Sequence, residues 1–538
     1  MTHPPSEPKA RIETYRSNMD GEERPYAVCS NASTTDPAPL LVEVSPGGTN
    51  LEKSLGLVEK IVEFASMAGK RCVAIRPTGR GPGSVYQNYG EVDTFEAISD
   101  TMEKFSIDQN RISVTGASMG GAATWYLVSH HPDFFSAGGP FCGYCDYRLW
   151  EKPGGLTFHM QDWEEPSWMA RSAALLPENF AHTPMWIVHG EWDRSVGGGV
   201  PVEHSRRMFA LLKEHGWDVR YTESPRIGHG CRTDEVFQKV VPWLLEQKKA
   251  ETVGDLTFAT YELRHNRSHW ATVDQLIEYG GKRASLSIHR DRPDEISITT
   301  ENVRTFALEW DEDNSPDVVR IDGQPMEASG PILPSIFQRD AKGDWSAIEE
   351  KKDAHEKRRR CSGPIGDLFH ANTLLVQGTT GSEEESHHLS LFTRKAASSY
   401  AEFNGGVHRG GILGENNVDL KIVTDIELSE TDRRENNLFL FGTQATNSVL
   451  AHFGNRLSLE FQEASLTVNG RVYKGDKVAL VVVFPHPENP DRYVAVHGGV
   501  TPDALTWGSH LNLNLLPDFI VYNGGDLLDW GFWNNEWK

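Results

Sequence analysis

The segment RISVTGASMGGAATW places one serine where an apolar run meets a stretch of small residues. Residues 111–116 are rich in β-branched side chains and predict a buried strand, and residues 122–132 predict a helix that ends at a proline. Gly116-x-Ser118-x-Gly120 therefore occupies a strand-to-helix turn. Glycines let strand and helix approach closely, and a helix start favours negative charge beside Ser118. This setting predicts a nucleophilic serine instead of an ordinary serine in a bend.

A nucleophilic serine needs a base, and the base needs an orienting acid. PMWIVHGEWDRSV predicts a buried strand followed by a loop that contains Asp193, which we prefer to Glu191 because Glu191 lies nearer the strand end. The predicted base is His229, which lies between two glycines in the loop before the last helix of this region. The other histidines considered lie before or inside earlier elements and are His182, His189, His204 and His215. Of these, His189 is expected to form a structural hydrogen bond beside the acid loop.

Acyl transfer also needs two N–H donors for the oxyanion. The N–H of Met119, directly after the nucleophile, is the expected first donor. The second is expected from the loop after the strand at 39–46, and Pro46 has no N–H to donate. Gly47 or Gly48 is therefore the candidate for the second donor.

Two segments are candidates for contact with a substrate. One is the glycine-rich loop 76–93, and the other is an aromatic-rich, lid-like insertion at about 141–180. The candidate contacts in and near them are Arg80, Tyr86, Tyr89, Trp150, Trp163, Trp168 and Trp192. The alternative is that the loop is held by its own side chains and that the tryptophans form the insertion's own core.

No metal or cofactor site is predicted. Cys142-Gly-Tyr-Cys145 is a CxxC without a second CxxC to complete a zinc site, so plain thiols are expected, with a local disulfide as the alternative in an exported protein. The glycine pairs do not open a strand–GxGxxG–helix unit, so no dinucleotide site is expected.

Strands and helices alternate over the first half of the chain. The expected strands are 39–46, 71–77, 111–116, 184–190 and 219–224, and the expected helices are 51–69, 91–105, 122–132, 202–216 and 233–249. Such alternation is typical of a doubly wound, mostly parallel sheet with helices on both faces. We therefore predict an α/β catalytic domain over residues 1–250.

The second half of the chain has a different pattern. Residues 251–345 alternate apolar and polar positions, which predicts mostly antiparallel strands, and residues 346–538 predict an α/β accessory domain that packs on the catalytic domain. The charge run 349–360 is expected to be a solvated helix or linker. The aromatic ending 529–538, DWGFWNNEWK, is expected to dock on the protein, near the lid.

Composition excludes several classes of partner. The 538 residues carry a formal net charge of −23, which disfavours nucleic acid and anionic membranes. The longest apolar run, VALVVVF, has the length of a strand and not of a membrane span. The N-terminus lacks the apolar core of a signal peptide, so we expect a cytoplasmic protein, or a secreted or periplasmic one whose signal has been removed. The oligomeric state stays open.

Several motifs in order carry a resemblance to a known superfamily. YRSNMDGEERPYAVCSN, RPTGRGPGSVYQNYGEVD, DQNRISVTGASMGGAATW, IVHGEWDRSV and RIGHG resemble α/β-hydrolases of the prolyl-oligopeptidase-like and polyhydroxyalkanoate-depolymerase/feruloyl-esterase-like branch. The resemblance covers residues 10–250 and implies a Ser-Asp-His hydrolase with Ser118, Asp193 and His229 as its triad. The Ser-Pro pair at the oxyanion loop departs from the pattern. The remainder is similar to the C-terminal extension of multidomain bacterial esterases, which implies no particular chemistry.

The function expected from these residues is hydrolysis of a carboxylic ester through an acyl-enzyme. The expected partners are a small-molecule ester or an acylated polysaccharide, because tryptophans and an accessory domain suit extended sugars. One alternative is a prolyl-oligopeptidase-like serine peptidase. The third hypothesis is a catalytically inactive carbohydrate-binding protein.

Overall fold

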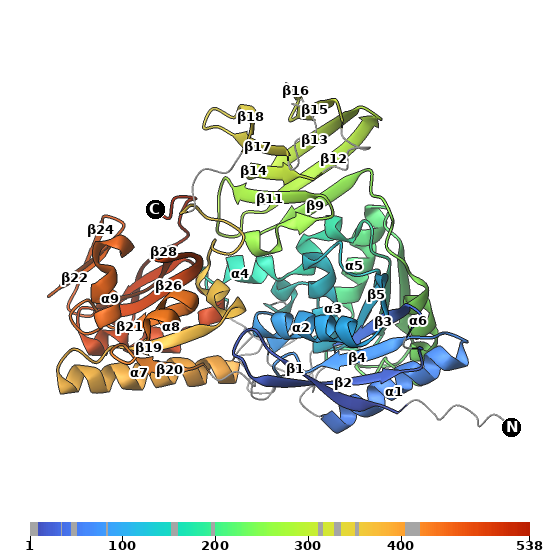
Figure 1. The fold of residues 1–538 in the computed structure, drawn as a ribbon, viewed down its shortest axis with the longest axis horizontal. Helices are drawn as coiled ribbons and strands as arrows, with labels where there is room; N and C mark the ends of the chain where they lie inside the picture. The colour runs from blue at the N-terminus through green and yellow to red at the C-terminus, as the bar shows by residue number, and fades with distance from the viewer. Residues whose placement is uncertain are drawn as a thin grey trace.

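The β-sheets fall into three groups, one in each of three successive parts of the chain (Figure 1). The first part is residues 11–246, the middle part residues 256–348 and the last part residues 365–538. The computed structural model describes residues 9–33, 35–44, 51–81, 84–151, 160–194, 199–309, 316–327, 335–349, 355–403 and 420–538. The first group lies at the right of Figure 1, the second above it, and the third at the left.

The first sheet has eight strands in the order β1-β2-β4-β3-β5-β6-β7-β8. The pairs β1–β2 and β2–β4 are antiparallel, and all the other neighbouring pairs are parallel. The strands are β1 (Arg11–Arg16), β2 (Glu23–Ser30), β3 (Ala38–Glu43), β4 (Val73–Pro77), β5 (Ile107–Ala117), β6 (Ala137–Phe141), β7 (Met185–Gly190) and β8 (Val219–Ser224). β1 and β2 were not expected: β1 (RIETYR) is mostly charged or polar, and the apolar run of β2 is only four residues long.

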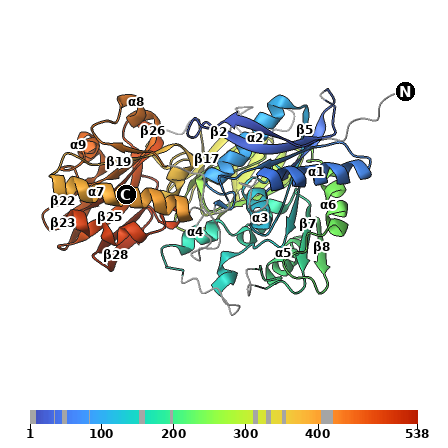
Figure 2. The same cartoon turned by 90° about the horizontal axis from the view of Figure 1, so that it is seen from below.

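Helices cover both faces of this sheet (Figure 2). α1 and α6 share one apolar cluster with the sheet, and α2, α3 and α5 share another. The helices of this part of the chain are α1 (Leu51–Met67), α2 (Tyr89–Lys104), α3 (Met119–His130), α4 (Glu165–Ala170), α5 (Glu203–Glu214) and α6 (Asp234–Glu246). The α/β fold predicted from the strand–helix alternation is confirmed.

The middle part of the chain forms two five-stranded sheets around one core. Their orders are β10-β11-β14-β17-β18 and β16-β15-β13-β12-β9, and every neighbouring pair except β13–β15 is antiparallel. The strands are β9 (Leu256–Thr260), β10 (Arg267–Ser268), β11 (Ala271–Leu276), β12 (Ala284–Arg292), β13 (Glu295–Glu301), β14 (Val303–Leu308), β15 (Val318–Ile321), β16 (Gln324–Glu327), β17 (Ser335–Arg339) and β18 (Trp345–Ile348).

The last part combines a seven-stranded sheet, in the order β20-β19-β21-β26-β25-β27-β28, with a three-stranded one, β22-β23-β24. The first four strands of the larger sheet are parallel, and the remaining pairs are antiparallel. The elements are β19 (Thr373–Gln377), α7 (Glu383–Phe403), β20 (Ile422–Thr424), α8 (Glu430–Glu435), β21 (Asn437–Phe441), α9 (Ser448–Phe453), β22 (Leu459–Gln462), β23 (Ser465–Val468), β24 (Arg471–Lys474), β25 (Val478–His486), β26 (Asn489–Gly499), β27 (Phe519–Asn523) and β28 (Asp526–Gly531).

The charge run before this last part is not wholly solvated, which corrects the sequence expectation. Lys357 is fully buried, and its Nζ lies 2.5 Å from Asp518 Oδ2. The ammonium also lies over the rings of Tyr279 and Trp537, 4.1 and 4.9 Å from their centroids. A carboxylate and two aromatic faces replace the water that the charge pattern alone predicted around this lysine.

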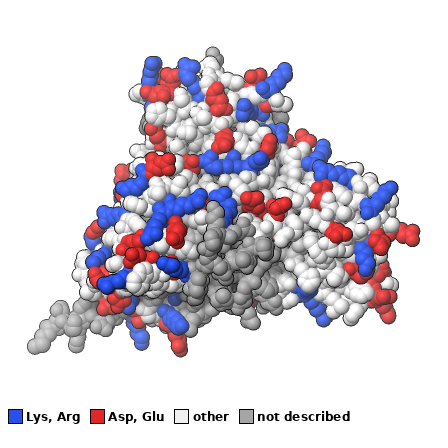
Figure 3. All heavy atoms as spheres, turned by 180° about the vertical axis from the view of Figure 1, so that it is seen from behind, with Lys and Arg blue, Asp and Glu red and all other residues white. Residues whose placement is uncertain are grey.

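The surface carries charges of both signs. On the face shown in Figure 3, basic and acidic side chains are interspersed over the described part of the chain. No helix in the described residues is long and apolar enough to cross a membrane.

The aromatic C-terminus docks on the protein. Trp533 is 1% exposed, stacks on Phe519, and donates a hydrogen bond from Nε1 to the Val483 carbonyl at 3.1 Å. Asn535 Nδ2 donates to the Leu276 carbonyl of the middle part, at 2.7 Å. Near the insertion, Phe532 lines a small cavity together with Pro166 and Ser167.

Replacing Trp533 with alanine should therefore destabilise the last part of the chain. Loss of a buried indole costs about 3–5 kcal/mol in unfolding free energy. Urea denaturation followed by tryptophan fluorescence measures it. The control is Leu528→Ala on β28, where the side chain is 45% exposed and the expected change is within about 0.5 kcal/mol. Equal stabilities of the two variants would contradict a docked terminus.

Candidate active site

Ser118 lies at the turn between β5 and α3 in a strained backbone conformation. Its φ is 59° and its ψ is −118°, and its N–H donates to the Phe141 carbonyl at 2.9 Å. Glycine is required at position 116, since a Cβ there would lie 2.5 Å from the Gly120 carbonyl oxygen. The turn therefore holds the Ser118 side chain at the carboxyl edge of the sheet, at the start of a helix.

His229 and Asp193 reach Ser118 from loops at the same edge. Asp193 follows β7, and His229 follows β8. His229 Nε2 lies 2.7 Å from Ser118 Oγ, and His229 Nδ1 lies 2.8 Å from Asp193 Oδ2. The three side chains predicted from sequence are thus brought into one hydrogen-bonded chain, in the geometry that lets a histidine take the proton of a serine hydroxyl.

Asp193 is 2% exposed and is held by two further hydrogen bonds. His189 Nε2 donates to its Oδ2 at 3.1 Å, and the Val200 N–H donates to its Oδ1 at 3.0 Å. His189 Nδ1 lies 2.7 Å from Ser205 Oγ, which orients the imidazole. The structural hydrogen bond expected of His189 is confirmed, and its effect is to position the carboxylate.

The electrostatics of the site follow from these hydrogen bonds. Burial raises the pKa of Asp193, but the hydrogen bonds from His189 and His229 outweigh it and hold that pKa below its ordinary value. The hydrogen bond to Asp193 is the largest cause that raises the pKa of His229 above its ordinary value. Asp193 therefore stabilises the imidazolium that forms when His229 accepts a proton.

Cys142 lies beside the active site, a position that the sequence did not indicate. Cys142 Sγ donates to the His229 carbonyl at 3.4 Å, and the thiol lies with Asp193 and His229 in one group of side chains. A hydrogen bond with Cys231, followed by burial, raises the pKa of Cys142 well above its usual range. The thiol is therefore protonated near neutral pH. All six cysteines of the chain are free, buried thiols.

The alternatives to Asp193 and His229 make other contacts. Glu191 Oε2 accepts from the Arg226 N–H at 2.8 Å. Two of the histidines face other rings, His182 against His269 and His215 against Trp217. His204 is buried, and its Nδ1 accepts from the Cys145 N–H at 3.2 Å.

One of the three candidate oxyanion donors lies within the described residues. Met119 is the first residue of α3, where backbone N–H groups have no partner inside the helix. Gly47 and Gly48 lie outside the described residues.

Two of the candidate substrate contacts are wrong because their side chains are buried. Arg80 is fully buried, and its guanidinium lies 2.6 Å from Asp20 Oδ2 and 3.2 Å from Asp93 Oδ1. Tyr86 is 3% exposed, and its hydroxyl points to the Pro77 carbonyl. Both side chains hold the loop 76–93 in place, as the alternative interpretation predicted.

The tryptophans have different surroundings. Trp163 packs against Trp507 of the last part, and Trp168 packs against Tyr147. Trp192, next to Asp193, is 55% exposed and is available to a ligand. The side chain of Trp150 lies outside what the structure describes.

The last part of the chain contributes to the wall beside the nucleophile. One buried apolar cluster contains Met119, Trp168 and Leu515. Next to Leu515, the Asn514 carbonyl accepts from Arg171 Nη2 at 3.0 Å, and its side-chain oxygen accepts from Asn88 Nδ2 at 2.7 Å. No sequence pattern relates positions this far apart.

Comparison with known proteins agrees with this geometry for one part of the chain. Residues 84–250 match the prolyl oligopeptidase family. Over 461 residues the chain is 23% identical to an uncharacterized secreted protein of Arthroderma benhamiae, which covers 79% of this chain and 46% of that protein. A probable chloroplastic glutamyl endopeptidase of Arabidopsis thaliana is 28% identical over 148 residues, 27% of this chain and 15% of the relative. The chain thus spans less than half of either relative.

Among solved structures, a thermostable esterase is similar to 45% of this chain and 63% of its own, with 22% identity and a TM-score of 0.35.

Replacing Asp193 with asparagine should cut kcat by about 10⁴, the scale seen when a triad loses its carboxylate. The substitution should also shift the acidic limb of the pH profile of kcat/KM. That limb rises as His229 loses its proton, and Asp193 raises the pKa of His229, so the wild-type midpoint is expected above about 6.5. Without the carboxylate the midpoint should fall to lower pH. Identical midpoints in both proteins would contradict this role for Asp193.

Proposed function

We propose that this serine-hydrolase domain of the prolyl oligopeptidase family cleaves carboxylic esters, with Ser118 as nucleophile, His229 as base and Asp193 as orienting acid. The observation that carries the proposal is the hydrogen-bonded chain from Ser118 Oγ through both ring nitrogens of His229 to Asp193. The strained turn at Ser118 supports it, since such strain persists where the surrounding structure imposes it.

The reaction proceeds in two halves. Ser118 Oγ attacks the ester carbonyl carbon while His229 Nε2 takes the hydroxyl proton, and the N–H of Met119 donates to the oxyanion. His229 then returns the proton to the leaving alkoxide, which leaves an acyl group on Ser118. A water molecule attacks the acyl carbon, gives its proton to His229, and the proton returns to Ser118 as the acid leaves.

We propose acyl esters of carbohydrates as the substrate class. Trp192 supports it, because an indole that is 55% exposed beside Asp193 offers a flat apolar face to a sugar or an aromatic acyl group. Leu515 of the last part shares a buried apolar cluster with Met119, which supports a role for the last part in shaping the site beside Ser118. The match to a protein named as secreted supports a location outside the cytoplasm.

A serine peptidase is the second candidate. The observation that favours it is the match of residues 84–250 to a family named for oligopeptide cleavage. The same triad is compatible with attack on an amide. If the protein hydrolyses acyl esters faster than aminoacyl anilides, the result supports the esterase. If it hydrolyses the anilides faster, the result supports the peptidase.

Ser118→Ala should abolish hydrolysis of a short aryl ester and labelling by a fluorophosphonate probe, because the reacting oxygen is removed. The matched control is Ser398→Ala on the exposed surface of α7, which should keep both. Unlabelled wild-type protein with a native melting curve would instead support a catalytically inactive binding protein. A panel of acetylated glycans, feruloylated glycans and peptides then identifies the substrate class.

Trp192→Ala should raise KM for an acylated glycan while kcat for a small aryl ester stays within about twofold. An aromatic contact contributes about 0.5–1.5 kcal/mol, which is about 2- to 10-fold in KM. Steady-state kinetics measures KM and kcat for both substrates. A KM for the glycan equal to that of the wild type would remove Trp192 from the substrate site.

A further inference from the structure

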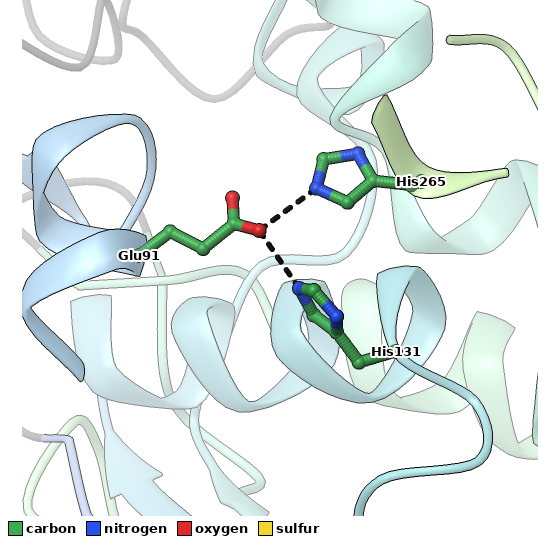
Figure 4. Close-up of side chains that lie close together, drawn as sticks. All are labelled: Glu91, His131 and His265. Carbon is green, nitrogen blue, oxygen red and sulfur yellow. Dashed lines mark hydrogen bonds and ion pairs between the residues drawn. The ribbon is translucent and has the colours of Figure 1, made fainter. Parts of the chain in front are cut away.

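Four ligand-type side chains from all three parts of the chain meet at one point away from Ser118. Glu91 lies on α2, and His131 directly follows α3. His265 lies in a short 3₁₀ turn (Leu263–His265) of the middle part, and His370 ends another (Ile365–His370) that begins the last part. We call these four residues the Glu91 cluster, and Figure 4 draws the first three.

The rings of two histidines point to one carboxylate oxygen (Figure 4). His131 Nε2 lies 2.7 Å from Glu91 Oε1, and His265 Nε2 lies 2.9 Å from the same oxygen. One ligand atom from each of the three residues lies within 4.8 Å of the other two. Tetrahedral zinc lies about 2.0–2.2 Å from each ligand and so separates its ligand atoms by about 3.3–3.6 Å, which means that the two imidazoles would move back only slightly from Glu91 to admit an ion.

The fourth residue has no hydrogen bond that explains its place. His370 Nε2 lies 3.7 Å from Glu91 Oε2, beyond hydrogen-bonding distance. Both ring nitrogens of His370 are buried, and neither has a hydrogen-bond partner among the described residues. A buried imidazole with neither nitrogen hydrogen-bonded is unfavourable, and a cation bound among the four side chains would give His370 a partner.

The surroundings orient the carboxylate toward the histidines. Tyr126 Oη donates to Glu91 Oε2 at 2.7 Å, which leaves Oε1 facing His131 and His265. Glu91 and His265 are 5% and 6% exposed, so the cluster is largely shielded from water. An oriented carboxylate held by an outer hydrogen bond is the usual arrangement around metal ligands.

We propose that Glu91, His131 and His265 bind one divalent transition-metal ion of the zinc class, with His370 as the fourth ligand. Two or three imidazoles and one carboxylate form a donor set that suits zinc, cobalt or nickel, whereas calcium and magnesium prefer oxygen donors alone. The ion is structural. His131 and Ser118 lie at opposite ends of the twelve-residue helix α3, and such a helix is about 18 Å long.

The ion would hold the three parts of the chain together. Its ligands are up to 279 positions apart, from Glu91 to His370, and lie on helices and turns of three parts of the chain that form separate sheets. An ion that binds only the assembled ligands stabilises the arrangement by mass action. The position of Leu515 beside the active site would then depend in part on this ion.

Metal content and the spectrum of a cobalt-loaded protein test the site. The full chain, purified without a polyhistidine tag and dialysed against trace zinc, should hold about one zinc per chain by mass spectrometry. Cobalt loading should give the visible absorption bands of a tetrahedral nitrogen–oxygen site. His131→Gln and His265→Gln should each weaken zinc binding by more than about tenfold, since loss of an outer-shell partner alone has that effect.

Two controls separate this site from its alternatives. His229→Gln disrupts the other metal-ligand-type group, formed by Cys142, Asp193 and His229, and should leave the metal content unchanged. Glu91→Gln keeps an oxygen that accepts hydrogen bonds from both histidines but removes the charge, so it should lower zinc affinity without unfolding the protein. Zinc should raise the melting temperature of the wild type and not that of Glu91→Gln.

Three outcomes would overturn the proposal. The first is a wild-type protein that holds no zinc, gives no cobalt spectrum and shows no change in melting temperature. The second is loss of metal in His229→Gln with retention in His265→Gln. The third is full metal content in Glu91→Gln, which would leave the cluster as a set of hydrogen bonds.

Discussion

α3 begins at the carboxyl edge of the first sheet and packs tightly against the sheet, and this packing fixes both functional ends of the helix. All twelve residues of this helix are buried, which is typical of a helix at the centre of a domain. Gly116 and Gly121 permit the approach, since a Cβ on Gly121 would lie 2.4 Å from the Phe141 carbonyl oxygen. Because the helix cannot move away from the sheet, the residues at its two ends occupy defined positions. One end carries Ser118, and the other leads to His131.

At the first end, parallel strands bring distant residues together. β5, β7 and β8 run in the same direction, so the loops that follow them lie at one edge. Asp193 is the central hydrogen-bond acceptor there, because it accepts hydrogen bonds from His189, His229 and the Val200 backbone. Burial makes those hydrogen bonds strong, and they keep the carboxylate ionised. The same carboxylate orients His229 toward Ser118.

At the second end, the three parts of the chain meet. Tyr89 on α2 packs against Phe369 and Tyr400 of the last part. The side chains of Arg80 and Tyr86 in the loop 76–93 are buried, so this loop supports the junction and does not hold the substrate. The accessory part reaches both the helix end and the active-site wall, where Leu515 belongs to the same cluster as Met119.

Apolar spacing and the order of motifs along the chain were enough to predict the elements and the chemistry of the first part. Strand and helix periodicity depends on local apolar spacing, so the helices α1, α3 and α5 were predicted to within a few residues, and Ser118 was singled out by its turn. The order of Ser118, Asp193 and His229 along the chain was enough to name the three side chains that meet. The other side chains that surround them could be identified only from the folded chain. Burial of Arg80, burial of Lys357 and the meeting of Glu91 with three histidines depend on contacts between distant segments, and no local spacing encodes such contacts.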